Sequence, residues 1–569
     1  MNNTRVAEIF DELADRLELL GDNPFKTRAY RTFADEVRNL SEPLALVHAR
    51  GEHRELAAVG RAIGDKIDAL FERGTFDALE RARAETPTGL LEVLHVPGLG
   101  PKTVQALWHH ANVTTLEELL AACEDDRVAN TPGVGKKKQE KIHGAVRILL
   151  GEKQQVLLAV ALESAGLVCA TLESAGASRV AVVGNARRGI EIVARVELIA
   201  LGLTPSAIAD AAEAADDHLL VRACSASTSD VHLVLQGRGE VHVVAIDDPN
   251  TWFVESILRT GDEAHIRWLE DRASAHGGLA KVGYGAASEE AIYALLDLPY
   301  VPPELREGPR PTVPADLLAR EGIRGVFHVH TEWSDGTSSI ANMARSAARA
   351  GFEYVGISDH SQAASYANGL DAPRLREQAA AIAEAREAVP EIRIFHGIEV
   401  DILPDGSLDL DDETLGSLDF VIASVHARFN MTIEEMTARL VRAVSHPLVT
   451  ILGHPTGRLL LGRKGYAFDV EAVARAARAN GTYLEINANA HRLDLSPPLV
   501  RKASLAGALF AINPDAHAEL GFDDVPLGVM VARRSGLAAD CVFNTAGKDA
   551  MEALLRDRRA RADKSAANA

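Results

Sequence analysis

The segment GVFHVHTEWSDG, residues 325–336, joins a short apolar run to a group of polar residues. His328 and His330 are two positions apart, so on a β-strand their side chains project from the same face. Six further apolar runs of this kind lie between residues 354 and 517, and Ala/Arg/Glu-rich helical stretches separate them. The alternation predicts a parallel α/β barrel of seven strand–helix units, with its active site at the carboxyl ends of the strands.

Nearly every one of these strands ends in a residue that can ligate a metal. A lone histidine at a strand end is more often a satisfied polar residue, but nine such residues at corresponding ends of one barrel indicate a metal site. Imidazole and carboxylate without thiolate suit Zn, Mn or Fe, and nine ligands predict two or three divalent ions, Mn²⁺ or Zn²⁺ with Fe as a further candidate. The predicted ligands are His328, His330, Asp335, His360, Glu399, His426, His454, Asp515 and His517.

These motifs identify a family. The segments HVHTEWSDG, SDHS, GIEVDIL, SVH, GHPTGR, LEINA and DAH, within residues 324–545, are similar to those of the PHP (polymerase and histidinol phosphatase) domain. The resemblance implies a distorted (β/α)7 barrel with a trinuclear metal site and phosphoesterase chemistry. Apart from Asp335, the nine ligands are also the expected catalytic residues. Arg458 in GHPTGR is either an additional phosphate contact or a surface arginine.

Composition restricts the class of protein. With 569 residues the chain is too long for one hydrophobic core, and no apolar run reaches the ~18 residues of a membrane span. The N-terminal stretch is an amphipathic helix with acidic residues throughout, and the four cysteines show no metal-ligand spacing. We therefore expect a cytoplasmic, monomeric protein without membrane contact. The net charge of -21 excludes a surface covered by nucleic acid but allows local basic patches.

Residues 1–150 consist of helices with short glycine-containing turns. VPGLGPKTV (96–104) and TPGVGKKKQEKI (131–142) resemble helix-hairpin-helix motifs, and VGRAIGDKI (59–67) is a variant. Glycine lets the backbone approach a phosphate, and the following helix presents free N–H groups. We expect sequence-independent DNA binding by Gly98, Gly100, Lys102, Gly133, Gly135, Lys136, Lys137 and Lys138.

The order of the segments along the chain extends the resemblance beyond the PHP-like part. NPFKTRAYR (23–31), with Lys26, Arg28 and Arg31, is similar to the small N-terminal domain of family X DNA polymerases, which binds a 5′-phosphate at a gap, although a solvated helix face is the alternative. Together with the β-rich residues 151–298 and the PHP-like part, the whole chain resembles bacterial family X polymerases. This similarity implies gapped or 3′-ended DNA as the partner.

The palm-like segment VVGNARRGIEIVARVELIALG (182–202) departs from the family pattern. Gly184, Arg187 and Arg188 match, but Asn185 replaces a serine. The two metal-binding aspartates align with Arg195 and Glu197.

The remaining palm positions also differ. The third aspartate aligns with His242, unless a slipped register brings Asp247 or Asp248 forward, and Asp262 occupies a nucleotide-binding position. A guanidinium about 4 Å from a divalent ion, at an effective dielectric near 20, costs about 8 kcal/mol. We therefore predict an inactive polymerase site; only an active palm would need Mg²⁺.

The predicted fold is multidomain, with a helical helix-hairpin-helix region, a nucleotidyltransferase-like α+β palm and thumb, and the PHP barrel. The expected boundaries are 1–84, 85–150, 151–298, a Pro-rich linker at 299–323, and 324–569. Three functions stay open: a metal-dependent DNA phosphoesterase (3′–5′ exonuclease, 3′-phosphatase or abasic-site endonuclease), an active gap-filling polymerase with proofreading, and a non-catalytic DNA-binding scaffold. A small-molecule phosphatase is less favoured, because the chain carries DNA-binding modules.

Overall fold

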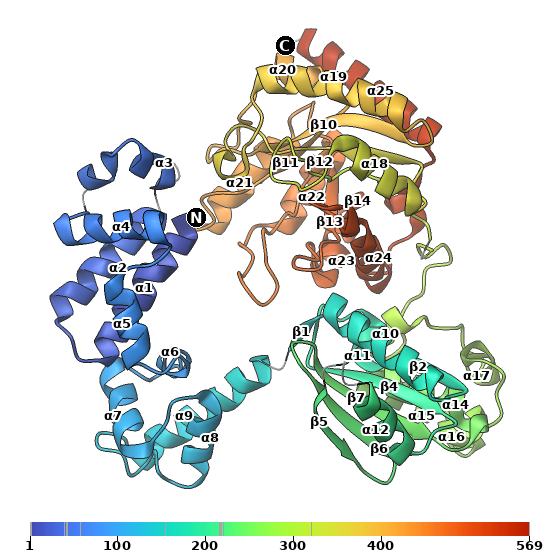
Figure 1. Cartoon of the computed structure of the whole chain (residues 1–569). Helices are drawn as coiled ribbons and strands as arrows, with labels where there is room; N and C mark the ends of the chain where they lie inside the picture. Colours follow the sequence, from blue (N-terminus) through green and yellow to red (C-terminus); the bar gives the residue numbers. More distant parts are fainter. Residues whose placement is uncertain are drawn as a thin grey trace. The chain divides into compact units, whose positions relative to one another are not determined.

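The computed structural model describes residues 3–38, 40, 44–56, 58–153, 155–215, 219, 221–319 and 321–567. The chain divides into two compact units, Met1–Gln154 and Gln155–Ala569. In the described residues the first unit is helical, whereas the second contains the sheets (Figure 1). None of the described helices is both long and apolar enough to cross a membrane.

The first unit has two separate hydrophobic cores. Val6, Phe10 and Leu13 form an apolar stripe on the first helix, and Phe10 packs edge-on against Phe33 at 4.6 Å between ring centroids. The first core involves α1 (Asn3–Leu19), α2 (Pro24–Arg38), α3 (Leu44–Ala49), α4 (Arg61–Arg73) and α5 (Asp77–Glu85). The second involves α6 (Gly89–Leu94), α7 (Pro101–Ala111), α8 (Leu116–Glu124) and α9 (Lys136–Lys153). The 3-10 turn η1 (Glu52–Glu55) follows α3.

The second unit begins with a mixed five-stranded sheet in the order β2-β4-β7-β6-β5. β4 and β7 are parallel, and the other neighbours are antiparallel. The apolar run at residues 190–200 contains two strands, β3 and β4, which are separated at Ala194. The elements are β1 (Val156–Leu157), α10 (Leu158–Ser174), β2 (Arg179–Val183), α11 (Gly184–Arg188), β3 (Ile192–Val193), β4 (Arg195–Leu201), α12 (Pro205–Ala214), β5 (Val221–Ala226), β6 (Asp230–Leu235) and β7 (Gly239–Ile246).

A helical subdomain follows the sheet and contains a buried ion-pair network. Glu289 accepts hydrogen bonds from Arg187 (2.7 Å) and Ser256 (2.7 Å) and pairs with Arg306 at 2.5 Å. Burial raises the pKa of Glu289, but Arg306 and Arg187 more than offset this and lower it to about 2. The elements are α14 (Trp252–Thr260), α15 (Glu263–Ala273), α16 (Leu279–Gly283), α17 (Glu289–Leu295) and the 3-10 turn η4 (Pro303–Leu305).

The Glu289 network shows that the prediction of a linker at 299–323 is wrong for its first part. Glu304 and Arg306 are fully buried. Arg306 binds Glu289, and Glu304 accepts a 3.0 Å hydrogen bond from Arg533, so two buried charges on this stretch need fixed partners. The first part of the segment is therefore packed structure rather than a tether.

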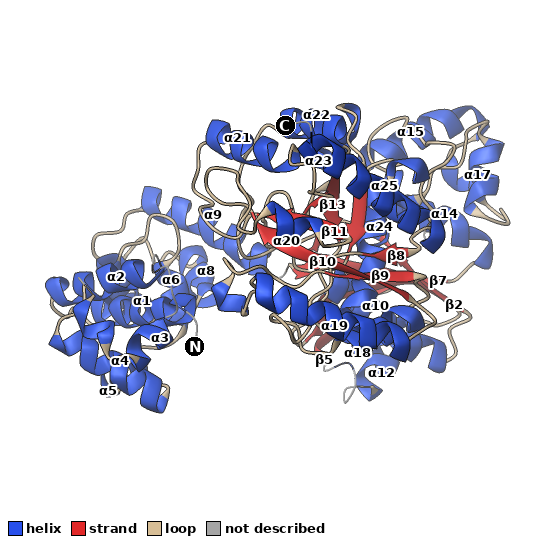
Figure 2. Cartoon of the chain, turned by 90° about the horizontal axis from the view of Figure 1, so that it is seen from above, coloured by secondary structure: helices blue, strands red, loops and turns tan. Residues whose placement is uncertain are grey.

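The seven predicted barrel strands are confirmed as a parallel sheet in the order β14-β13-β12-β11-β10-β9-β8. A bridge between Val329 and Ala516 joins the two edges, and helices flank the strands (Figure 2). The strands are β8 (Gly325–Val326), β9 (Tyr354–Ile357), β10 (Arg393–Asp401), β11 (Phe420–Ser424), β12 (Ile451–Leu452), β13 (Tyr483–Asn487) and β14 (Phe510–Asn513). The helices are α18 (Ile340–Arg349), α19 (Ala372–Ala388), α20 (Asp412–Gly416), α21 (Ile433–Val444), α22 (Val470–Asn480), α23 (Pro497–Leu505), α24 (Val525–Arg534) and α25 (Lys548–Ala567).

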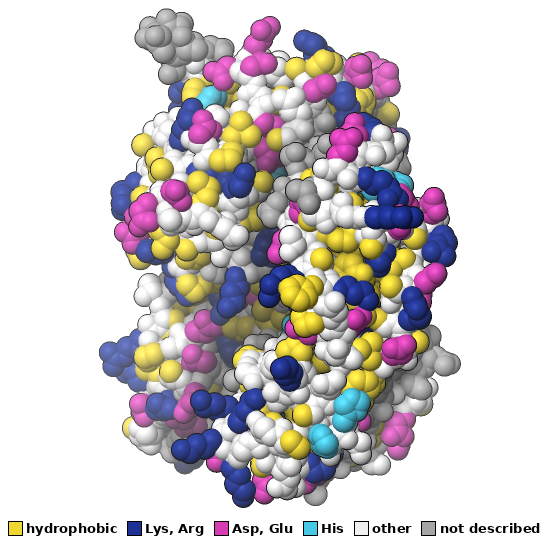
Figure 3. Space-filling view, turned by 90° about the vertical axis from the view of Figure 1, so that its left-hand side faces the viewer, with side chains coloured by type: hydrophobic (Ala, Val, Ile, Leu, Met, Phe, Trp, Pro, Cys, Tyr) yellow, Lys and Arg dark blue, Asp and Glu magenta, His cyan; other side chains and the backbone are white. Residues whose placement is uncertain are grey.

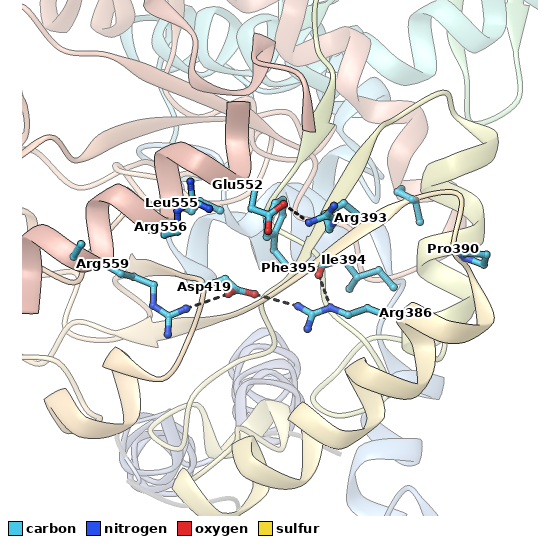
Figure 4. A pocket seen from close by; sticks show the side chains of 12 residues that line it. Arg386, Pro390, Arg393, Ile394, Phe395, Asp419, Glu552, Leu555, Arg556 and Arg559 are labelled. Carbon is cyan, nitrogen blue, oxygen red and sulfur yellow. Dashed lines mark hydrogen bonds and ion pairs between the residues drawn. The ribbon is translucent and has the colours of Figure 1, made fainter. Parts of the chain in front are cut away.

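A cavity of about 740 Å³ lies at the amino ends of β10 and β11, next to α25 (Figure 4). Asp419 pairs with Arg386 and Arg559 at 3.2 Å each, and Arg393 pairs with Glu552. These ion pairs attach α19 and α25 to the base of the barrel. The arrangement supports the barrel from the end opposite to the predicted ligands.

Replacing Glu289 with Gln should destabilise the second unit by about 3–5 kcal/mol, because the buried Arg306 and the partly exposed Arg187 lose their counter-charge. Since the pKa of Glu289 is lowered to about 2, its contribution is present at neutral pH and is lost only as the pH falls toward that value. Calorimetric unfolding measures the effect. Glu290→Gln, at an exposed neighbouring position, is the control; equal unfolding temperatures for the two variants would contradict the role of the network.

Candidate metal centre

The structure brings all nine predicted ligands together at the carboxyl ends of the barrel strands. Six of the seven strands, all except β13, deliver these residues to one place because parallel strands end at the same side of the sheet. The residues form four overlapping groups whose ligand atoms lie within 4.8 Å of one another: His330, Asp335, His360 and His517; His328, His454 and Asp515; His328, His330 and Glu399; and His360, Glu399 and His426.

Glu399 on β10 is the centre of this arrangement. Its Oε1 lies 3.2 Å from His328 Nε2, 3.4 Å from His426 Nε2 and 3.0 Å from His454 Nε2. Its Oε2 lies 2.9 Å from His360 Nδ1 and 3.5 Å from His330 Nε2. One fully buried carboxylate therefore contacts five imidazoles.

Two further carboxylates complete the cluster. Asp515 Oδ1 lies 3.5 Å from His328 Nε2 and 3.3 Å from His330 Nε2. Asp335 lies 3.5 Å from His360 and 3.4 Å from His517.

The buried polar atoms of the cluster fit bound cations. Both ring nitrogens of His330, Nδ1 of His360, Nε2 of His426 and Oε2 of Glu399 are buried without a hydrogen-bond partner. Such atoms are costly unless something binds them. A donor set of imidazole and carboxylate suits Zn, Mn or Fe, so these residues can hold divalent metal ions.

Mutual charge shifts the pKa values in the cluster. Burial alone would raise the pKa of Glu399, but His328, His426 and His360 hold it well below its ordinary value. Conversely, burial alone would lower the pKa of the histidines, yet Glu399 raises the pKa of His360 to about 10 and that of His426 to about 9. The site thus strongly favours positive charge next to Glu399.

Several residues that support the ligands were not predicted. Glu485 Oε1 lies 2.8 Å from His328 Nδ1, and Glu485 Oε2 accepts the His454 backbone N–H at 2.7 Å. Asn487 donates to Glu485 and to Asp515 at 3.0 and 3.1 Å. The motif LEINA contains both residues, so a search for polar residues inside apolar strands could have found them.

For Arg458 the sequence left open either a phosphate contact or a surface arginine, and the structure gives its guanidinium other partners. Its Nε donates to the Arg492 carbonyl at 2.9 Å, and its Nη2 binds the Leu493 carbonyl and Glu191, 3.2 Å away. Arg492, which was not predicted, lies nearer the ligands and pairs through Nε with Asp515 at 3.1 Å. Arg458 therefore holds the segment that carries Arg492, because backbone carbonyls and Glu191 already take up its guanidinium.

At the palm position, Arg195 and Glu197 pair with each other. Arg195 Nη2 lies 3.1 Å from Glu197 Oε1 on β4. The strand register places Glu197 opposite His242, and His242 lies 3.6 Å from Asp230. Among the described residues, no group of three metal ligands forms on this sheet.

The other palm residues have structural partners. Arg188 binds the Thr260 carbonyl and Asn185, while Arg187 belongs to the Glu289 network. Gly184 has φ +68°, and a Cβ there would lie 2.0 Å from Glu197 Oε2. Asp262 caps α15 by accepting the His265 N–H at 2.7 Å and also accepts the Gly308 N–H at 2.8 Å.

The two well-formed hairpins lie next to each other in the first unit. Gly98 and Gly133 have φ +88° and +79°, and Gly100 and Gly135 directly precede α7 and α9. Lys138 donates to Thr103 at 3.1 Å and so links the two hairpins. Of the other predicted contacts, Lys102 and Lys137 are exposed, and Lys136 lies 3.6 Å from Asp126.

The predicted DNA-binding residues near the N-terminus differ in whether they are already ion-paired within the protein. Lys26 pairs with Asp22 at 2.7 Å, and Arg31 pairs with Glu18 at 2.6 Å. Arg28 is exposed and makes no ion pair with any described residue. On the face in Figure 3, Lys and Arg are interspersed with acidic and apolar side chains. This face therefore has small groups of basic residues rather than one continuous basic surface.

Comparison with known proteins decides the family. Residues 1–76 match a helix-hairpin-helix domain, 90–147 a SAM-like helix-hairpin-helix tandem, 256–307 the DNA polymerase beta thumb, and 327–489 the PHP domain. The DNA polymerase/3′-5′ exonuclease PolX of Bacillus subtilis (strain 168) is 32% identical over 98% of this chain and 100% of its own length. The chain belongs to the family X DNA polymerases with a C-terminal PHP domain.

Two probable phosphatases are also similar to part of this chain. A probable phosphatase of Thermoanaerobacter sp. (strain X514) is 29% identical over 38% of this chain and 89% of its own length. A second probable phosphatase, from Acetivibrio thermocellus, is 33% identical over 28% of this chain and 63% of its own length.

Glu485→Gln should weaken metal binding by about 10–100-fold, because the variant loses the charge that orients His328. Competition of the full chain with a chelating dye measures the affinity. Glu434→Gln, on an exposed position of α21, is the control and should bind metal like the original chain. Unchanged affinity in the Glu485 variant would contradict this orienting role.

Replacing Lys136, Lys137 and Lys138 together by Ala should weaken DNA binding equally on all sequences. Each lost phosphate contact should also reduce the slope of log K against log salt by about 0.9 on duplex DNA. Binding titrations at several salt concentrations measure both effects. An unchanged slope would show that these lysines are only a solvated helix face.

Proposed function

We propose that this chain is a DNA-binding, metal-dependent phosphoesterase that acts on 3′ ends of damaged or gapped DNA, and that its palm does not polymerise. The observation that carries the proposal is the convergence of five histidines on the buried carboxylate of Glu399. Nine ligands exceed the needs of one ion. The PHP match and the helix-hairpin-helix matches support the combination of hydrolysis and DNA binding.

The chain's own residues would prepare the site for hydrolysis. Divalent ions, Mn²⁺ or Zn²⁺, would supply Lewis-acid charge and a nucleophile near neutral pH when bound by the nine ligands. Glu485 holds His328, and Asp401 lies 3.3 Å from His426 Nδ1, so these two imidazoles have a fixed orientation. Arg492 positions Asp515 through Nε, and its Nη atoms hydrogen-bond to no described residue. These Nη groups are available for a substrate phosphate.

An exposed aromatic residue beside the ligands favours a nucleic-acid substrate. Tyr366 is 63% exposed, although its ring centroid lies only 6.2 Å from that of His360. Aromatic side chains stack on bases without sequence preference. A terminal base stacked on Tyr366 would place its phosphodiester near the metal ligands, which suits exonuclease activity better than hydrolysis of a small phosphate ester.

The palm supports the second half of the proposal. Phosphoryl transfer by two metals depends on carboxylates that hold both ions. Here Arg195 pairs with Glu197 at 3.1 Å, and an imidazole stands opposite Glu197. An active polymerase is the alternative, favoured by the name of the Bacillus subtilis relative. The arginine in the palm argues against it.

His330→Ala should abolish hydrolysis of a 3′-labelled gapped duplex in Mn²⁺ and leave DNA affinity within about twofold. The reason is that the ligands belong to the barrel, whereas the hairpins belong to the first unit. A gel assay and a binding titration measure the two properties. His446→Ala, a histidine of the barrel outside the four ligand groups, is the control. Full nuclease activity in the His330 variant would refute the site.

A triple variant, Arg195→Asp, Glu197→Asp and His242→Asp, should gain a Mg²⁺ or Mn²⁺ site on the palm. Arg195→Asp alone should gain none, because the ions need all three carboxylates. Calorimetric titration in the His330→Ala background measures the gain. If the unrepaired palm already binds metal in that background, the assignment of Arg195 to the first aspartate position is wrong.

A further inference from the structure

A second group of metal-ligating side chains lies in the first unit, away from the barrel. His48 on α3, His53 on η1 and Asp68 on α4 have ligand atoms within 4.8 Å of one another. His48 Nε2 and His53 Nε2 each lie 3.0 Å from the same oxygen, Asp68 Oδ1. Three separate elements thus direct two imidazoles and a carboxylate at one point.

His53 is the unusual member of the group. Its side chain is only 5% exposed, and both of its ring nitrogens are buried without a hydrogen-bond partner. The Nε2 atom is close to Asp68 Oδ1 but is not aligned for a hydrogen bond with it. A buried imidazole with two unsatisfied nitrogens is costly. A cation between His53 and Asp68 would satisfy Nε2 without that alignment.

The surroundings orient the carboxylate toward the histidines. Asp68 Oδ2 is bound by Arg54, which also pairs with Asp65 at 2.9 Å. Oδ1 remains for His48 and His53. The His48 ring is itself held by stacking on Phe71, at 4.8 Å between centroids. The barrel shows the same pattern, in which several imidazoles meet one carboxylate whose environment is fixed by neighbouring residues.

We propose that His48, His53 and Asp68 bind a transition-metal ion, with Zn²⁺ as the best fit. Two imidazoles, one carboxylate and a water would complete a tetrahedral site. His48 is 23% and Asp68 32% exposed, so the position is accessible from solvent. The site is independent of the hydrolytic function proposed for the barrel.

The consequence of such a site is local order next to the hairpin-like segment 59–67. The metal would attach α3 and η1 to α4, and α4 begins at Arg61, directly after the glycine of the first hairpin-like segment, 59–67. A ligand set drawn from three elements would add to the core contacts that Leu44, Val47, Ile63 and Ile67 make in this stretch. The ion would therefore serve as a structural clip rather than as a catalyst.

The test is the zinc content of the full chain. After equilibration with Zn²⁺ and removal of free metal, His53→Gln and Asp68→Asn should each contain one ion fewer per chain than the original protein, as measured by mass spectrometry. The same difference should persist in the His330→Ala background, because the two sites share no residue. His110→Ala, an exposed histidine of the same unit, is the control and should lose none.

A second measurement separates metal loss from misfolding. Zn²⁺ should slow amide hydrogen exchange in residues 44–70 of the original chain and have no such effect in Asp68→Asn, whose side chain is nearly isosteric. Equal zinc content in the original chain and both variants would overturn the proposal. So would exchange that responds to Zn²⁺ equally in the original chain and the Asp68 variant.

Discussion

The buried carboxylate of Glu399 is the interaction on which the barrel site depends. A carboxylate without solvent is stable only if positive charge surrounds it, and here five imidazoles, which follow four of the strands, lie within 3.5 Å of its oxygens. Those imidazoles meet because seven parallel strands end at one side of the sheet. Fold and chemistry are therefore linked: a change in strand register would separate the ligands and leave the charge of Glu399 unpaired.

Much of the barrel could be predicted, because its signals are local. Each strand is a short apolar run, and most ligands lie near the end of a strand, so alternation and residue type were sufficient. Glu485 and Arg492 could not be found in this way, since their roles depend on contacts with His328 and Asp515 from distant parts of the chain. The same limit left open whether Arg458 contacts a phosphate or is a surface arginine; its partners are a backbone segment and Glu191.

The Pro-rich segment illustrates a different limit. Proline content correctly excluded regular helix and central strand, but composition does not show whether an irregular segment is packed. Glu304 and Arg306 are buried because Arg533 and Glu289 pair with them, and these partners lie 229 and 17 residues away. In the palm, Arg187 joins the same network, so residues retained from the polymerase pattern contribute to stability. A palm that does not polymerise would still be needed to stabilise the second unit.

The most direct test uses one gel. A 5′-labelled primer in a gapped duplex is incubated in Mn²⁺, with and without dNTPs, with the original chain and with Asp515→Ala. We predict that the original chain shortens the primer equally with and without dNTPs, and that the variant leaves it unchanged. A product longer than the primer, from either protein, would contradict the account of the palm. Equal shortening by both proteins would contradict the account of the barrel.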